Sequence, residues 1–140
     1  MKTKTHLLLF CVVILFVLSA CIASLAGDPL KGTSWALVSF GGTSPLPDTH
    51  PTLAFEDGQV KGNASCNSFG GEYKVKGDKM IFGDLYWTLM ACMDNGVMDQ
   101  EQAYMRMLAG EAEFELTEGQ LKLTNQQGEV LIFEPMGGQD

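Results

Sequence analysis

The cysteines and histidines are the first candidates for nucleophilic or metal chemistry, and they are Cys11, Cys21, Cys66, Cys92, His6 and His50. A catalytic triad needs a histidine, but His50 is the only one after the first 20 residues, and it lies in a proline-rich loop. Two cysteines and one histidine do not complete a tetrahedral zinc site at a familiar spacing. Cys66 would need a neighbouring base to act as a nucleophile. We therefore expect no enzyme, no metal and no cofactor.

The first 21 residues have the pattern of an export signal. Lys2 and Lys4 precede an uncharged apolar run over residues 7–17, and small residues follow, as in a secretory signal peptide. The residues Leu18-Ser19-Ala20-Cys21 resemble the lipobox of prokaryotic lipoproteins. In that family the cysteine thiol receives a diacylglycerol and the peptide is cut just before it. We predict a signal peptide over residues 1–20 and a lipid on Cys21.

Two other interpretations of this segment stay open. Residues 7–26 carry no charge and could cross a bilayer as an uncleaved helix. Plain cleavage by the ordinary signal peptidase is the other alternative. All three place the following chain outside the cytoplasm, in the cell envelope. With a lipid on Cys21, residues 21–29 form a tether to the membrane. Ile22, in place of an acidic residue, favours the outer membrane, facing the periplasm, if the host has two membranes.

Length and composition limit what the chain can be. It has 140 residues and a mass of 15.2 kDa, which suits one modest domain rather than two. Nine basic residues face 17 acidic ones, and a chain with a net charge of -8 is a poor candidate for binding nucleic acid. Hydrophobic residues make up 46% of the sequence, as in ordinary globular domains. We expect one folded domain over residues 30–140 and no nucleic acid partner.

After residue 30, short apolar alternations are separated by turn signals. The dipeptides Asp57-Gly58, Gly77-Asp78 and Glu118-Gly119 are typical of tight hairpin turns. The alternation predicts strands over residues 34–40, 52–55, 60–63, 72–76, 79–82, 113–117, 121–124 and 130–133. The pattern predicts a mainly β fold, an antiparallel meander that forms a small partial β-barrel.

Residues 97–109 have helical periodicity instead. Their apolar stripe is formed by Ala103, Tyr104, Met107 and Leu108, with Gln100 starting it. Asp94 or Asn95 can cap the start of this helix, and Asp99 and Glu101 suit its positive N-terminal end. We predict one α-helix over about residues 97–109, covering an open edge or end of the barrel.

Cys66 and Cys92 are an even pair that remains if Cys11 leaves with the signal peptide and Cys21 takes the lipid. In an exported, oxidising setting such a pair favours a disulfide. The bridge would close a loop of about 27 residues and stabilise the fold by roughly 3–4 kcal/mol. Because sequence cannot show that two sulfur atoms meet, two free buried thiols remain the alternative.

Four parts of the chain share an order and spacing with a known family. They are residues 30–37 (LKGTSWAL), residues 51–73 (PTLAFEDGQVKGNASCNSFGGEY), residues 90–92 (MAC) and the helix positions Gln100, Glu101, Tyr104 and Leu108. Together they resemble the META domain family, which includes the HslJ heat-shock lipoprotein, over about residues 30–134. Two positions depart from the family pattern: Ser65 stands where the family usually has glycine, and Leu89 where it often has arginine. The resemblance implies a role in envelope stress or maintenance.

The residues around Cys66 have two interpretations. Their glycines permit bends or close approaches, and their asparagines can bind loop backbone groups through side-chain amides. Aromatic side chains are candidates to fill the barrel interior, and they are Trp35, Phe55, Phe69, Tyr73 and Trp87. In the first interpretation the corner is purely structural, and the family motif supplies Trp35, Asn67, Phe69, Gly71 and Tyr73 to it. In the second, the same corner is a binding surface.

The methionines near the second cysteine also have two interpretations. Five of them cluster there, namely Met90, Met93, Met98, Met105 and Met107. Such flexible side chains commonly fill gaps in a core, but they can also form a pliable groove for an apolar ligand or a partner segment.

These observations predict a non-catalytic envelope lipoprotein with one META/HslJ-like domain. Our first hypothesis is a structural or interaction module that meets an envelope protein. The alternative is a carrier, because a partial barrel with an apolar interior could hold a lipid or another apolar ligand.

Overall fold

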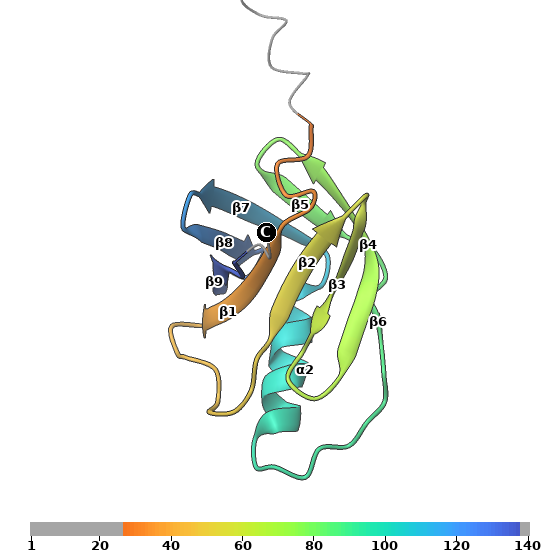
Figure 1. Ribbon diagram of the computed structural model, residues 1–140, viewed down its shortest axis with the longest axis vertical. Coiled ribbons are helices and arrows are strands. Elements are labelled where there is room, and N and C mark those ends of the chain that lie inside the picture. The colour runs from red at the N-terminus through yellow and green to blue at the C-terminus, as the bar shows by residue number, and fades with distance from the viewer. Residues whose placement is uncertain (1–26, 138–140) are drawn as a thin grey trace, which may run out of the picture.

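The computed structural model of the chain describes residues 27–137, and Figure 1 shows a barrel of antiparallel strands with one helix beside it. The predicted signal peptide, Cys21 and the first part of the tether lie outside these residues. The elements in chain order are β1 (Ser34–Phe40), β2 (Thr52–Glu56), β3 (Gln59–Asn63), β4 (Ser68–Lys76), β5 (Lys79–Phe82), β6 (Tyr86–Trp87), α2 (Val97–Leu108), β7 (Glu111–Thr117), β8 (Gln120–Asn125) and β9 (Val130–Pro135).

All strands except β6 close into a full barrel, so the predicted partial barrel is wrong. Each strand of this ring pairs antiparallel with the next, as the predicted meander requires. β9 then pairs with β1 and joins the last strand to the first. The long strand β4 pairs with β3 along its first half and with β5 along its second half. The ring therefore keeps no open edge.

β6 is not a member of the ring; it continues from β5 along the same edge of β4, beside the first half of that strand. The pairs are Phe69 with Trp87 and Gly70 with Tyr86. Because Trp87 belongs to this outer strand, it is 48% exposed, and the prediction that it fills the interior is wrong. The other aromatic candidates are buried as predicted, and they are Trp35, Phe55, Phe69 and Tyr73.

The tight turns follow the predicted dipeptides. Asp57 and Gly58 both have positive φ, 46° and 77°, as a type I′ turn requires. The helix also begins where it was predicted, but its cap differs. Gly96, at φ 83°, holds the N-cap position without a side-chain hydrogen bond, so the predicted cap by Asp94 or Asn95 is wrong. A backbone turn replaces it, in which the Val97 N–H donates to the Asp94 carbonyl oxygen at 3.3 Å.

One face of α2 is part of the core. Tyr104 is fully buried, and its ring centroid lies 6.0 Å from that of Phe69 and 6.4 Å from that of Phe133. Its hydroxyl donates to the Thr52 carbonyl oxygen at 3.1 Å. Burial raises the pKa of Tyr104 well above its ordinary value, because an apolar surrounding disfavours the charged phenolate. The interior is therefore packed by both strand and helix side chains.

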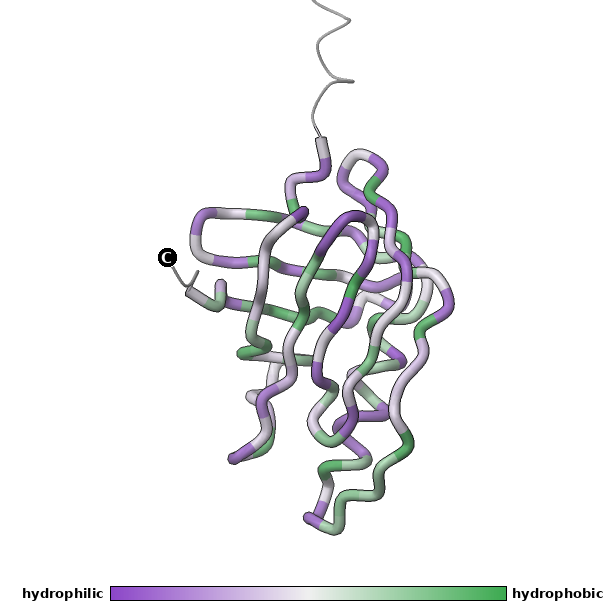
Figure 2. Tube along the Cα trace, turned by 45° about the vertical axis from the view of Figure 1, so that its right-hand side comes forward, coloured by the Kyte–Doolittle hydropathy of each residue, from purple (hydrophilic) through white to green (hydrophobic). Residues whose placement is uncertain are grey.

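The colouring in Figure 2 shows hydrophilic and hydrophobic residues alternating along the strands. In β2, β5 and β8 the buried positions are every second residue, as expected for strands with one face on a core and one in solvent. Within residues 27–137, no helix is both long enough and apolar enough to span a bilayer.

Candidate functional site

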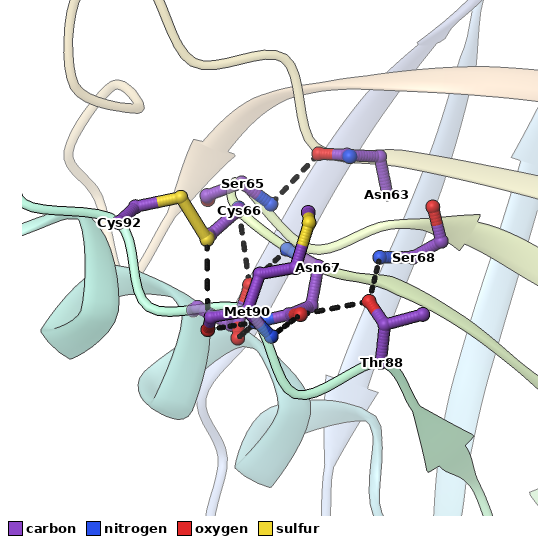
Figure 3. Close-up of a disulfide and its surroundings, with 9 residues drawn as sticks. Asn63, Ser65, Cys66, Asn67, Ser68, Thr88, Met90 and Cys92 are labelled. Atoms are coloured by element: carbon purple, nitrogen blue, oxygen red, sulfur yellow. Dashed lines mark hydrogen bonds between the residues drawn. A yellow bond between two sulfur atoms is a disulfide. The ribbon is translucent and has the colours of Figure 1, made fainter.

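A disulfide joins the loop before β4 to the segment after β6. The Cys66 and Cys92 sulfur atoms are 2.00 Å apart, and the two Cα atoms are 6.0 Å apart (Figure 3). The predicted pairing is confirmed, and the alternative of two free thiols is wrong. The bridge ties the chain between β6 and α2 to the barrel wall, so this connection is held at both ends and also near its middle.

Asn67 joins the same two segments by hydrogen bonds (Figure 3). Its Oδ1 accepts from the Met90 N–H at 2.7 Å and from the Thr88 hydroxyl at 2.7 Å. Its Nδ2 donates to the Met90 carbonyl oxygen at 3.1 Å and to Glu101 Oε1 at 2.7 Å. Only 1% of Asn67 is exposed, so these bonds form where water does not compete for them.

The Glu101 carboxyl group is the acceptor on the helix side of this network. Its Oε2 accepts from the Asn67 N–H at 2.6 Å and from the Cys66 N–H at 3.0 Å, while Oε1 accepts from Asn67 Nδ2. Glu101 is only 5% exposed, and no lysine or arginine of residues 27–137 forms an ion pair with it. Hydrogen-bond donors alone therefore stabilise this buried group.

Gln100 binds the β1–β2 loop by hydrogen bonds, as Glu101 binds the loop that contains Cys66. Its Oε1 accepts from the Leu46 N–H at 2.7 Å, and its Nε2 donates to Thr49 Oγ1 at 2.9 Å and to Ser65 Oγ at 2.8 Å. Two adjacent helix residues thus hold the β1–β2 loop and the β3–β4 loop together. His50 lies in the first of these loops and is exposed.

A set of large apolar side chains is exposed around the disulfide, and we call it the corner face. It consists of Tyr86, Trp87, Leu89, Met90, Met93 and Met98. Leu89 and Met93 are the extreme cases, at 90% and 92% exposed. Met105 and Met107, in contrast, are buried in the core. Core packing therefore describes Met105 and Met107, whereas the interpretation as a pliable binding surface applies to the exposed methionines.

A groove of about 780 Å³ lies beside the corner face, and we call it the helix groove. One wall is formed by residues 82–85 and Trp87, and the other by α2 from Met98 onward. Its apolar lining includes Phe82, Leu85, Trp87, Met98 and Met105, and its charged lining includes Asp84, Asp99 and Arg106. The groove lies outside the packed barrel interior, between the helix and the outer strand β6.

The family model described as the META domain matches residues 28–137. The chain belongs to the META domain family. An NMR structure of a protein from Burkholderia xenovorans has 28% sequence identity and a TM-score of 0.66, and the match covers 82% of this chain and 94% of that one. A second NMR structure shares the fold, with 24% identity, a TM-score of 0.65, and 78% and 95% of the two chains covered. No curated protein matches this chain.

The matches cover 94% and 95% of the two solved chains, so the shared fold forms there with little chain outside it. In this chain the barrel has its own core and closes on itself within residues 27–137. We therefore expect the domain to fold without the segment that precedes it.

Ser65, the departure from the family glycine, has a backbone conformation that favours glycine. Its φ is 118°, a region that L side chains rarely adopt. The serine side chain adds one hydrogen bond that glycine cannot make, because its Oγ accepts from Gln100 Nε2 at 2.8 Å. The Ser65 backbone N–H donates to Asn63 Oδ1 at 2.8 Å, as a glycine N–H also could. The substitution therefore exchanges backbone freedom for a side-chain contact with the helix.

The other motif residues have structural positions. Trp35 Nε1 donates to Thr33 Oγ1 at 2.7 Å, and the Tyr73 hydroxyl donates to the Asp28 carboxyl group. Phe69 lies in the core against Tyr104. Gly71 has no room for a side chain, because an added Cβ would lie 2.7 Å from the Leu85 side chain. This close approach lets Asp84 and Leu85 bulge over Gly71, between the residues of β5 and those of β6 that pair with the same edge of β4.

Glu101 is the site residue whose role the sequence reasoning missed. Its charge predicts a role at the positive N-terminal end of the helix, but Glu101 lies on the buried stripe with Tyr104 and Leu108. The spacings of three and four residues among these positions were the available signal. Among residues 27–137, no three histidine, cysteine, aspartate or glutamate side chains gather as metal ligands would.

We expect Glu101→Gln to destabilise the domain by about 2 kcal/mol, because both Glu101 oxygens accept from N–H donors. A glutamine would place its own NH₂ group against one of those donors. The measurement is urea unfolding of the oxidised domain. The matched control is Asp99→Asn, an exposed acid two residues away in the first helical turn. Equal stability of the two variants would contradict the assigned role.

We expect Ser65→Gly to be more stable than Ser65→Ala by about 1–2 kcal/mol. Both variants lose the bond to Gln100, worth about 1 kcal/mol, but only glycine relieves the backbone strain at this φ. Thermal unfolding of the two variants beside the wild type measures the difference. An alanine variant as stable as the glycine variant would show that Ser65 is not strained.

Proposed function

We propose that this chain is a non-catalytic, membrane-anchored lipoprotein of the cell envelope, whose META domain binds an envelope protein through the corner face. The observation that carries the proposal is the exposure of six large apolar side chains in one segment. Large exposed apolar patches are rare on monomeric proteins and mark surfaces that bind something. The proposed setting is envelope stress or maintenance.

The rigidity of the corner supports a binding role. A mobile loop would lose conformational entropy when it binds, whereas a pre-organised one loses less. Here the disulfide, Asn67 and Glu101 fix the backbone at Cys66, Thr88, Met90 and Cys92. The exposed Leu89 and Met93 side chains lie directly beside these fixed points. The residues that fix the backbone thus flank two exposed side chains that contribute little to the stability of the fold.

The position of the corner face supports a partner other than the anchoring membrane. In Figure 1 the described chain begins at one end of the long axis, and the connection between β6 and α2 forms the opposite end. With a lipid on Cys21, the corner face would point away from the membrane that holds the anchor.

The packed interior favours this proposal over the carrier hypothesis. The inside of the ring is occupied by buried side chains, including Trp35, Phe55, Phe69, Tyr104 and Phe133. A carrier of the barrel type needs apolar space there. The non-catalytic assignment is supported by Cys66, whose sulfur is bonded to Cys92 and so is not a thiolate nucleophile.

For the anchor, we expect the mature protein to begin at a diacylated Cys21. Mass spectrometry of the protein isolated from membranes should show the lipid mass on that residue and no residue before it. Cys21→Ser should carry no lipid, because serine lacks the thiol that receives the diacylglycerol in the lipoprotein family. An unmodified Cys21 in the mature wild-type chain would contradict the lipoprotein proposal.

For the corner face, we expect a photo-crosslinking residue at Met93 of the full chain to give a repeatable adduct with one envelope protein in intact cells. The matched control is the same residue at Glu118, an exposed position on the β7–β8 turn. A Met93→Asp variant that carries the crosslinking residue at position 89 should give no adduct with that envelope protein. No repeatable adduct, or equal adducts from Glu118, would contradict the proposal.

A further inference from the structure

Within residues 27–137, β6 pairs only with β4, and its other edge lies beside the helix groove. The Thr88 N–H donates to the Ser68 carbonyl oxygen at 3.0 Å, which places this residue's N–H toward β4. Backbone groups point in alternate directions along a strand, so the N–H and C=O of Trp87 point away from β4. Trp87 also lines the helix groove. A backbone donor and acceptor are therefore available at the wall of an apolar groove.

The groove has the length of a short strand. α2 has 12 residues and forms the second wall, which makes that wall about 18 Å long. About five residues of extended chain cover the same length. Phe82, Leu85 and Met105 line the groove, so side chains on one face of such a strand would contact apolar surface.

The charges around the groove favour a basic occupant. Every charged residue from Gly83 to Gln102 is acidic, and these residues are Asp84, Asp94, Asp99 and Glu101. Glu101 is occupied by its three internal donors, but the others are exposed. Arg106 is the single cation of the lining and lies two helical turns beyond Asp99. The same acidity disfavours a surface of anionic lipids.

We propose that the helix groove binds an extended polypeptide segment of alternating apolar and basic residues, which adds to β6 as a further strand. The segment pairs with the Trp87 backbone, places its apolar side chains against the groove lining and turns its basic side chains toward Asp84 and Asp99. Strand addition at a free edge is a common mode of peptide recognition. This inference rests on the proposed function, because it names the chemistry of the partner at the same corner.

The test uses the soluble domain, residues 27–140, and a capped octapeptide of alternating valine and lysine. We expect saturable amide chemical shift changes at Leu85, Trp87 and Met98 in NMR titrations. A peptide of alternating valine and glutamate should bind at least tenfold more weakly. The valine–lysine peptide with every backbone nitrogen methylated should also bind at least tenfold more weakly, because it cannot pair with a strand.

Variants of the domain give the matched comparison. Asp84→Asn should weaken binding of the valine–lysine peptide severalfold, whereas Asp78→Asn, in the distant β4–β5 turn, should not change it. The proposal is overturned if the peptide causes no shifts at millimolar concentration, or if the methylated peptide binds equally well. It is also overturned if phosphatidylglycerol vesicles, and not the peptide, perturb the same signals. If Met93 crosslinks to an envelope protein but the peptide does not bind, the proposal of strand addition is wrong and the proposed interaction function stands.

Discussion

The corner of this domain depends on one buried carboxyl group. Glu101 lies on α2, and it accepts hydrogen bonds from the backbone on both sides of the Cys66–Asn67 peptide bond and from the Asn67 side chain. A buried acceptor with three donors fixes the helix against the β3–β4 loop more specifically than apolar contact does, because each bond has a direction. The disulfide and the Asn67 contacts to Thr88 and Met90 extend this constraint to the chain after β6.

Barrel closure explains why the corner lies outside the core. Once β9 pairs with β1, the ring is complete and its interior is filled by side chains of the strands and the helix. β6 continues beyond β5 along the same edge of β4, and Gly71 leaves room for Asp84 and Leu85 to bulge over β4 between the two strands. The chain that continues to α2 is held at the surface, and its large apolar side chains face solvent.

Structure and proposed function are therefore separated in space. The packed ring and the aromatic motif residues stabilise the domain, and the corner face and helix groove are the surfaces that we propose meet a partner. Ser65 and Leu89, the two departures from the family pattern, both lie at this corner. Ser65 adds a bond to the helix at a strained φ, and Leu89 adds exposed apolar surface where the family often has a positive charge.

Most elements of the fold, and the family, were predictable from local patterns in the sequence. Period-two alternation, the turn dipeptides and the helical stripe are local signals, and they placed α2 and most strands of the ring close to their observed ends. The start of β4 was wrong, because the strand predicted from residue 72 begins at Ser68. An even pair of cysteines in an oxidising compartment also predicted the Cys66–Cys92 disulfide. Only the tertiary structure decided barrel closure, the outer position of Trp87, the backbone cap at Gly96 and the role of Glu101. These depend on contacts between residues far apart in the chain, and local periodicity carries no information about which strands or loops meet.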